Sequence, residues 1–305
     1  MRTRALSLFP AVSILFASST LHAVPVHQWS KRFGDTSYQV CRSVAADASG
    51  NVVVAGRFAN RVDFGGGPLP NGGIFVAKFD ANGNHVWSKG IGDNGSIAVA
   101  VDGPGNVVLT GYFEGTVNFG GGPLTSAGFN DIFVAKLDSN GNHLWSQRFG
   151  DVFGQYGWSV AADGSGNVVA TGYFSGTVDF GGGPLTSAGP NDIFVAKLDS
   201  NGNHLWSQRF GDGFGQYGQS VATDASGNVV VTGYFAGTVD FGGGPLTSAG
   251  VDIFVAKFDA SGNHIWSQRF GDGAYQAGNS VAADGLGDVI VCGEMSGTVD
   301  FGGGP

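Results

Sequence analysis

The chain has 305 residues, of which 42% are hydrophobic, 12% aromatic and 13% charged, with 55 glycines and a net charge of −9. This length suits one large domain or two small ones. The glycines do not recur at every third residue, which excludes a collagen helix. The aromatic content excludes a disordered tail. The acidic balance argues against nucleic acid and anionic membrane surfaces as partners.

The N-terminus has the pattern of an export signal. Arg2 and Arg4 precede an uncharged, mostly apolar run over residues 5–17, and small and polar residues lead to Ala23. Because the apolar run is too short to cross a bilayer, no membrane insertion is expected. We predict a signal peptide over 1–23 and export to the periplasm, the cell surface or the medium. Its removal deletes two arginines and no acid, so the net charge becomes −11.

A repeat of about sixty residues fills residues 27–305. The phrase H-x-W-S recurs around Trp29, Trp87, Trp145, Trp206 and Trp266, and F-G-G-G-P recurs from Phe64, Phe119, Phe180, Phe241 and Phe301. Residues 120–151 and 181–212 differ only at Phe129 against Pro190. Such near-identity indicates duplication of a whole structural unit. Complete units are predicted at about 43–90, 98–150, 159–211 and 220–271, with a partial unit at 280–305 and a lone final strand at 27–33.

The third unit predicts four strands, called A to D. They cover 159–163, 167–174, 193–198 and 204–210 and are rich in Val, Ile, Phe, Trp and Thr. Short turns that begin with Asp and end with Gly join A to B and C to D, whereas residues 175–192 form a long B–C loop. No stretch of the repeat shows sustained helical periodicity.

Strands B and C are apolar at both parities, as in the run from Ile193 to Ala196. Strands of a sheet with one solvent-exposed face alternate apolar and polar side chains. These strands do not, so their sheets must be covered on both faces by neighbouring sheets. Radially stacked, four-stranded antiparallel sheets satisfy this requirement. The sequence therefore predicts an all-β fold, a β-propeller of four complete units with partial first and last units. A closed ring of five and a truncated piece of a larger ring both remain open.

The repeated phrases resemble a known family. The runs S-V-A-A-D-x-S-G-N-V-V-V-T-G-Y-F and D-I-F-V-A-K-L-D-x-x-G-N-x-x-W-S are similar to the bacterial β-propeller repeat called SBBP, over essentially all of 27–305. The resemblance implies an exported bacterial protein of undefined function, and it brings no catalytic residues with it.

Three repeated polar features are interpreted as structural. The Asp turns, such as those at Asp163 and Asp199, lack the glycine and acid spacing of a calcium loop, so no metal or other cofactor is predicted. The histidines of H-x-W-S would lie on the outermost strand, too far apart to share an ion. The lysines of F-V-A-K and the arginines of W-S-Q-R-F are expected to lie along apolar surface with their charges at the edge.

Functional variation is expected on one edge of the disc. Because neighbouring strands are antiparallel, the B–C and D–A connections share an edge, and loops on a rigid scaffold are where function concentrates. The D–A segments supply the candidate ligand-binding residues Tyr38, Gln39, Gln155, Tyr156, Trp158, Gln216, Tyr217, Tyr275 and Gln276. The alternative is that these aromatic side chains fill the packing between units.

The sequence favours a non-enzymatic binding or surface-interaction module whose partner is a protein or a glycan. A lectin-like carbohydrate site is the first alternative, and a propeller-based hydrolase or lyase is the second. An enzyme is disfavoured because near-identical units supply like groups in a ring, whereas catalysis needs unlike groups at one place.

Whether the two cysteines are bridged depends on whether the first and last units are neighbours in a closed ring. Alignment places Cys292 at the position of Ala55, and counting back from the A–B turn sets Ser43 opposite Val54, so that Cys41 lies at a similar height. A disulfide would staple a ring of five units, but its Cα atoms must approach within about 7 Å. We expect both thiols to be free.

Overall fold

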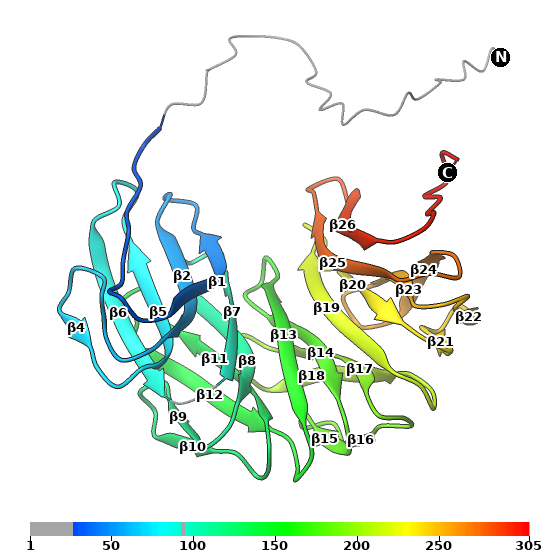
Figure 1. Ribbon diagram of the computed structural model, residues 1–305, viewed down its shortest axis with the longest axis horizontal. Helices are drawn as coiled ribbons and strands as arrows, with labels where there is room; N and C mark the ends of the chain where they lie inside the picture. Colours follow the sequence, from blue (N-terminus) through cyan, green and yellow to red (C-terminus); the bar gives the residue numbers. More distant parts are fainter. Residues whose placement is uncertain (1–26, 93–94, 305) are drawn as a thin grey trace.

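The computed structural model describes residues 27–92 and 95–304, so the predicted signal peptide lies outside the described residues. All regular structure in the described part is β, and four-stranded antiparallel sheets follow one another along the chain. Figure 1 shows these sheets arranged around an open arc. This confirms the predicted propeller-like architecture, without a closed ring.

Each complete unit has its strands in the order A, B, C, D within one sheet, and a single pairing of Gly92 with Val117 extends the sheet of unit one into a hairpin of unit two. Unit one contains β1 (Gln39–Ala46), β2 (Val52–Phe58), β5 (Gly73–Phe79) and β6 (His85–Gly92). Unit two contains β7 (Gly95–Val101), β8 (Val107–Phe113), β11 (Asp131–Leu137) and β12 (His143–Phe149). Unit three contains β13 (Gln155–Ala162), β14 (Val168–Phe174), β17 (Asp192–Leu198) and β18 (His204–Phe210). Unit four contains β19 (Gln216–Thr223), β20 (Val229–Phe235), β23 (Asp252–Phe258) and β24 (His264–Phe270). Unit five has β25 (Gln276–Ala283) and β26 (Val289–Met295), which form a two-stranded sheet.

The long B–C connection, expected as a loop, contains a small hairpin in units one to four. These hairpins pair β3 (Val62–Asp63) with β4 (Pro68–Leu69), β9 (Thr116–Asn118) with β10 (Pro123–Thr125), β15 (Thr177–Asp179) with β16 (Pro184–Thr186), and β21 (Thr238–Asp240) with β22 (Pro245–Thr247). The phrase F-G-G-G-P turns each hairpin. In unit three the Asp179 carboxylate accepts hydrogen bonds from the Gly181 and Gly183 amides, so the acid before the phrase fixes the glycine turn.

Strand A begins earlier than the sequence predicts, at Gln155 in unit three, because a bulge between Gly157 and Ser159 realigns it with strand B. Glycine is required opposite this bulge. A Cβ on Gly172 would lie 1.9 Å from the Tyr156 carbonyl oxygen and 2.9 Å from the Phe194 ring. The glycine of each G-Y-F phrase therefore lets strand A and the strand C phenylalanine approach the same backbone.

The A–B and C–D turns are closed by their own aspartates, as predicted. The Asp199 Oδ1 accepts hydrogen bonds from the Asn201 and Asn203 amides, and its Oδ2 accepts one from the Asn203 side chain at 2.8 Å. Every donor lies within four residues, so the turn needs no metal ion. These hydrogen bonds hold the pKa of Asp199 below its usual value.

The lysines of F-V-A-K are not at the edge, and that expectation is wrong. Their side chains are buried, and each ammonium pairs with the A–B turn aspartate of its own unit. The four ion pairs, at 2.9–3.2 Å, are Lys78–Asp47, Lys136–Asp102, Lys197–Asp163 and Lys257–Asp224. The sequence gives no sign of this burial, because a lysine within an apolar strand usually lays its aliphatic stem along the strand and extends its ammonium to solvent. The arginines of W-S-Q-R-F keep about a third of their side chains exposed and pair with the first residue of strand C, as in Arg209–Asp192.

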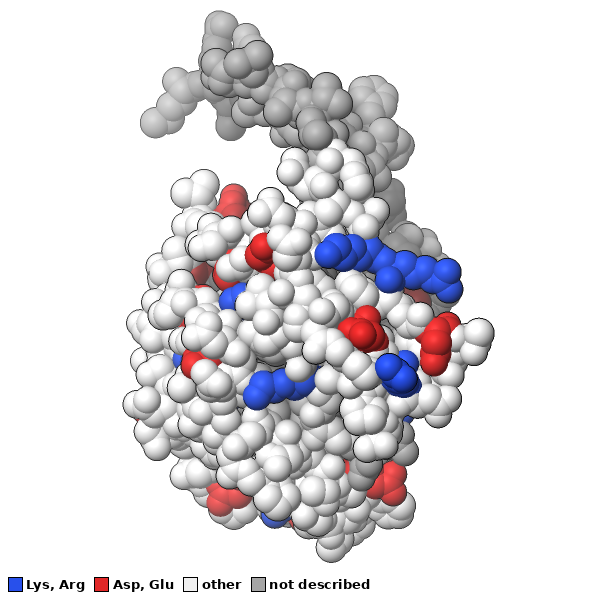
Figure 2. All heavy atoms as spheres, turned by 90° about the vertical axis from the view of Figure 1, so that its left-hand side faces the viewer, with Lys and Arg blue, Asp and Glu red and all other residues white. Residues whose placement is uncertain are grey.

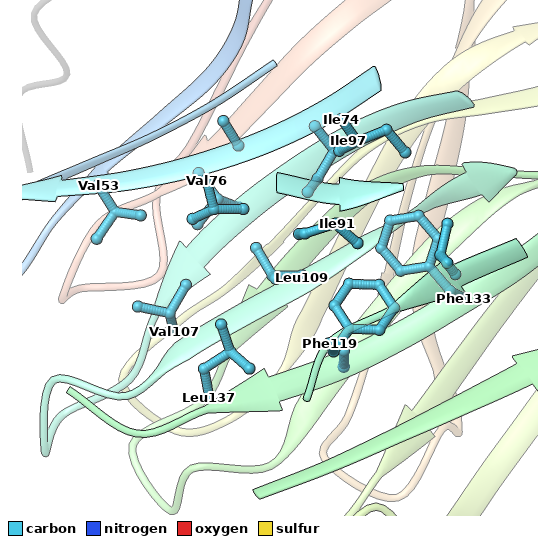
Figure 3. Close-up of a cluster of buried hydrophobic side chains, with 14 of the residues drawn as sticks. Val53, Ile74, Val76, Ile91, Ile97, Val107, Leu109, Phe119, Phe133 and Leu137 are labelled. Atoms are coloured by element: carbon cyan, nitrogen blue, oxygen red, sulfur yellow. The ribbon is translucent and has the colours of Figure 1, made fainter. Parts of the chain in front are cut away.

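The hydrophobic core lies between units rather than inside one sheet. Figure 3 shows the core between units one and two, where Val53 and Val76 of unit one face Leu109 and Phe133 of unit two. Strands B and C contribute side chains to the cores on both of their faces, which explains their lack of alternation. At the start of the arc, Val44 is 65% exposed, whereas its counterpart Val160 is 7% exposed. Unit one therefore has no covering neighbour on that side among residues 27–92 and 95–304.

Each unit is also tied to the next by polar links from strands A, C and D. The Ser159 hydroxyl accepts a hydrogen bond from the Val221 amide, and the Trp145 indole donates to the Ser200 carbonyl at 3.0 Å. Trp87 is buried, whereas its counterparts in units two to four are only half-buried. The H-x-W-S histidines bond the serine of their own strand, as His204 does with Ser207 at 3.0 Å.

Residues 27–33 take the position of a strand D that precedes unit one. Trp29 donates its indole hydrogen bond to the Ala81 carbonyl at 3.1 Å, and Phe33 packs against Phe64 with ring centroids 5.1 Å apart. Both contacts repeat those made by strand D of the complete units. The segment itself pairs with no strand among the described residues.

Both cysteines are free and exposed. Cys292 lies opposite Ser280, as Ala55 lies opposite Ser43, which confirms the alignment of the two units. The predicted pairing of Ser43 with Val54 is wrong by one residue, because the A–B turn includes Asn51 and pairs Ala46 with Val52, which sets Ser43 opposite Ala55. A bulge between Cys41 and Ser43 then sets Cys41 opposite Gly56.

Candidate functional site

The B–C and D–A connections lie at the same edge of the arc, here called the loop face, as the strand order predicts. Backbone hydrogen bonds join them across neighbouring units: the Gln155 amide donates to the Asn130 carbonyl at 2.8 Å, and the Gln216 amide donates to the Asn191 carbonyl at 2.9 Å. The loop face is therefore a continuous, hydrogen-bonded surface that spans several units.

Three of the four candidate glutamines are not available to a ligand. Gln155, Gln216 and Gln276 are fully buried. The Gln155 amide nitrogen donates to the Asp151 carboxylate at 2.6 Å and to the Ser175 carbonyl at 2.8 Å, and the other two repeat this pattern. They hold the D–A loop against the end of strand B, which corrects their assignment as ligand contacts. Gln39 is half-buried and bonds Asp35 at 2.8 Å.

The candidate aromatics of units three to five stack with tyrosines of strand B into one aromatic row. Its members are Tyr112, Tyr156, Trp158, Tyr173, Tyr217, Tyr234 and Tyr275, and the tyrosine ring centroids lie 4.7–5.9 Å apart along it. Trp158 packs beside it, 5.8 Å from Tyr112 and 6.2 Å from Tyr173. Most of these rings are half-buried, so the row forms packing between units and also leaves ring surface accessible.

Sequence reasoning missed Tyr112, Tyr173 and Tyr234, because each was taken as part of a strand. The signal was their restriction to units two to four: the matching residue of the G-Y-F phrase is Arg57 in unit one and Glu294 in unit five. A position that is tyrosine three times and charged at both ends of the array indicates a surface confined to the middle of the arc.

Three hydroxyls of the aromatic row, those of Tyr173, Tyr234 and Tyr275, stay protonated at physiological pH. Burial raises the pKa of Tyr173 and of Tyr234 to about 12. The pKa of Tyr275 is raised mainly by burial and, to a smaller extent, by the nearby Glu294 carboxylate. The Asn191 side chain donates to the Tyr217 hydroxyl at 3.2 Å. Tyr173, Tyr234 and Tyr275 therefore offer neutral rings and hydroxyl donors.

Exposed apolar side chains rim the loop face beside this row. This apolar rim consists of Tyr38, Phe129, Val152, Phe153 and Phe214, each 53–72% exposed. The Asp151 carboxylate accepts the Phe153 amide hydrogen bond, and Asp212 does the same for Phe214, so the phenylalanines project from tight turns. Gly128 lies against the Val152 backbone, which brings the loop of Phe129 next to Phe153. The sequence analysis did not select Phe153 and Phe214. In their D-x-F-G segments it chose the glutamine and tyrosine that follow as the candidate ligand contacts.

Charged side chains make up only 13% of the residues of the chain. In Figure 2, which shows the side of the arc formed by the first units, acidic and basic side chains are scattered and most of the surface is uncharged. Within residues 27–92 and 95–304, no three His, Cys, Asp or Glu side chains are grouped to hold a metal ion. Large exposed apolar side chains on a soluble scaffold are typical of sites that bind another protein or an apolar ligand.

The chain resembles two known proteins over much of its length. It is 22% identical, over 89% of its residues, to an uncharacterized WD repeat-containing protein of Acanthamoeba polyphaga mimivirus. It is 25% identical, over 75% of its residues, to the regulatory protein FlaEY of Caulobacter vibrioides. The chain spans about a quarter of the length of each. No family model matches the chain.

The WD-repeat resemblance agrees with the repeated four-stranded sheets and supports a propeller-like repeat protein of the kind that serves as an interaction module. No helix within the described ranges is long and apolar enough to cross a membrane.

Proposed function

We propose that the chain is an exported, non-enzymatic propeller module of the bacterial SBBP type that binds another protein through its loop face. The observation that carries the proposal is the apolar rim, in which Phe129, Phe153 and Phe214 stand more than half exposed on hydrogen-bonded turns. Exposed aromatic anchors on a rigid scaffold supply most of the binding energy in protein interfaces. The aromatic row behind them gives the rim a packed base.

A protein partner is favoured over a carbohydrate. Sugar recognition combines aromatic faces with convergent polar side chains, but the glutamines expected to supply those groups are buried and engaged in the loops. The rim that remains is apolar, and apolar contact area is what a protein partner buries. A hydrolase or lyase is disfavoured because the turn aspartates accept hydrogen bonds from their own loops and the buried ones pair with lysine.

Export is tested by the mature N-terminus. When the full chain is expressed in a bacterium with a general secretion pathway, we expect a protein that begins at Val24 in the periplasm or medium, because cleavage follows small residues after the apolar run. Mass spectrometry of that fraction measures it. An intact Met1 on protein retained in the cytoplasm would contradict export, while the rim could still bind a partner.

Binding through the rim is tested by site-specific photocrosslinking. A benzophenone side chain at Phe153 or Phe214 is expected to capture the same surface or secreted protein of the producing cell, because both positions lie on the loop face. The matched control is Leu144, which is similarly exposed but lies on strand D at the outer side of unit two. Replacing both phenylalanines by serine should then weaken binding of the captured protein at least about tenfold. Equal capture from Leu144 and Phe153 would contradict the proposal.

A further inference from the structure

The aromatic row is a regular surface across the middle of the arc. Units three and four each contribute two tyrosines that stack on each other. Tyr156 stacks on Tyr173 with ring centroids 4.9 Å apart, and the same pair in unit four is Tyr217 on Tyr234, at 4.7 Å. Neighbouring units meet edge-on, as Tyr217 does with Tyr173 at 4.8 Å. The row therefore repeats one stacked and one edge-on contact per unit.

The row is continuous with the apolar rim. In unit three the D-x-F-G loop lies directly on the ring of the tyrosine that follows it, since a Cβ on Gly154 would lie 2.9 Å from a Tyr156 ring carbon and 3.0 Å from its hydroxyl oxygen. Phe153 immediately precedes this glycine and is 53% exposed. A partner segment that contacts Phe153 therefore lies beside Tyr156 as well.

The backbone under the row is already paired. Strand β14 pairs with β13 on one side and with β17 on the other, and β20 is flanked in the same way by β19 and β23. The row therefore presents no strand edge to which a β-strand could add. A partner is recognised here by aromatic rings and hydroxyl groups.

The hydroxyl groups of the row can donate to a ligand. The Tyr156 hydroxyl oxygen accepts a hydrogen bond from the Asn130 side chain at 3.2 Å, so its own proton remains a donor. Asn191 does the same for Tyr217. In the described part of the chain, no hydroxyl oxygen of the row is buried without a partner. Burial raises the pKa of Tyr173 to about 12, which keeps its proton in place. A complementary ligand brings carbonyl acceptors and apolar surface, with few N–H donors to desolvate.

Charge marks the two ends of the row. The position that is tyrosine in units two to four is Arg57 in unit one and Glu294 in unit five. Arg42, which is exposed, lies on strand A of unit one, and the Glu294 carboxylate lies beside the Tyr275 hydroxyl. An extended ligand laid along the row therefore meets positive charge at one end, negative charge at the other and uncharged rings between them.

We propose that the row binds a proline-rich segment of the protein partner, held as a polyproline II helix with a basic residue at Glu294 and an acidic residue towards Arg57. This inference rests on the proposed function, because it names the segment that the loop face receives. Proline supplies a ring and a carbonyl but no N–H, and a polyproline II backbone has no internal hydrogen bonds, so its carbonyls can accept from the tyrosine hydroxyls.

The repeat lengths also agree. One turn of a polyproline II helix advances about 9 Å. This is close to the two ring steps that each unit contributes, which are 4.7–4.9 Å each in units three and four. Aromatic grooves recognise such helices because the ligand is ordered before it binds. Successive turns of the ligand can therefore meet successive units in the same way.

The test is fluorescence polarisation with the full chain and the labelled peptide R-P-P-L-P-P-L-P-P-E, whose ten residues span about 31 Å as polyproline II. The control peptide R-G-A-L-G-A-L-G-A-E keeps the charges and the leucines but is flexible. We expect the proline peptide to bind at least about tenfold more tightly, because less ordering is needed. Equal affinities would overturn the proposal, and so would binding of a linear glucan hexaose with none of the peptide.

Two variants locate the peptide. Tyr173→Phe keeps the stacked ring and removes one hydroxyl donor, so it should weaken binding about threefold to tenfold. Glu294→Gln should weaken binding of the arginine peptide but not of the same peptide with alanine in place of arginine. Leu144→Ala, on the outer strand of unit two, should change nothing. An unchanged affinity for Tyr173→Phe would overturn the proposal.

The result is separable from the rim experiment. Photocapture from Phe153 together with equal affinities for the two peptides would overturn the polyproline assignment and leave the proposed function standing. Tight binding of the proline peptide without capture from Phe153 or Phe214 would support the row and contradict the rim.

Discussion

Replacing Asp163 by alanine is expected to lower the free energy of unfolding by about 3–5 kcal/mol, because the change leaves a buried lysine without its partner. Lys197 is 2% exposed and its ammonium lies 3.0 Å from Asp163. Burial of Asp163 opposes its ionisation, but the Asn167 amide and the Lys197 ammonium outweigh that effect and hold its pKa below the usual value. Urea unfolding followed by tryptophan fluorescence measures the loss.

The matched control is Asp199→Ala, in the C–D turn of the same unit. Asp199 accepts similar turn hydrogen bonds but is only half-buried and pairs with no lysine among the described residues, so its loss should cost only about 1 kcal/mol. Adding Lys197→Met to Asp163→Ala should restore much of the stability, because it removes the unpaired charge and keeps the apolar stem. Equal losses for the two aspartate variants would show that the ion pair contributes nothing beyond its turn.

The architecture could be predicted because its signals are local and repeated. The Asp-to-Gly turns set the strand limits at one edge, and the two-sided apolar runs of strands B and C required neighbours on both faces. What the sequence could not indicate is how deep a charged side chain lies. Lys197 has the same neighbours in sequence whether its ammonium reaches solvent or Asp163, and the choice depends on a turn more than thirty residues away.

The candidate site was predicted only in part for a related reason. The D–A loops were found because they vary between near-identical units, but within them the glutamines turn inward to Asp151 and its counterparts, and the phenylalanines turn outward. That choice is made by the loop backbone, which the short phrase D-x-F-G-Q-Y does not specify. The strand B tyrosines join the site through the stacking of neighbouring units, and a pattern within one unit carries no trace of that contact.

Ring closure was the other question that the sequence left open. It depends on the angle between successive units, which is set by the size of side chains in each shared core rather than by any one motif. Among the described residues both ends of the arc are exposed: Val44 is 65% exposed at one end and Ile290 is 65% exposed at the other, although their counterparts in the interior of the arc are covered. A large apolar residue at the same repeat position is thus exposed or covered according to whether a neighbouring unit is present.

This contrast yields the second large expected effect, at the first residue of F-G-G-G-P. Phe180 is 2% exposed and packs between Phe149 and Phe194, with ring centroids 4.9 and 5.0 Å away. Phe180→Ala should lower the free energy of unfolding by about 3–5 kcal/mol, through lost burial and the cavity that remains between units two and three. Phe301 holds the same repeat position at the open end of the arc.

Phe301→Ala should therefore cost less than about 1 kcal/mol, since the ring is already more than half exposed and touches only the edge of unit four. Urea midpoints of the two variants, compared at an unchanged slope, separate the effect of the neighbour from that of the residue. A small loss for Phe180→Ala would mean that the core between units tolerates a cavity. A large loss for Phe301→Ala would mean that the ring is covered in solution, contrary to its 60% exposure.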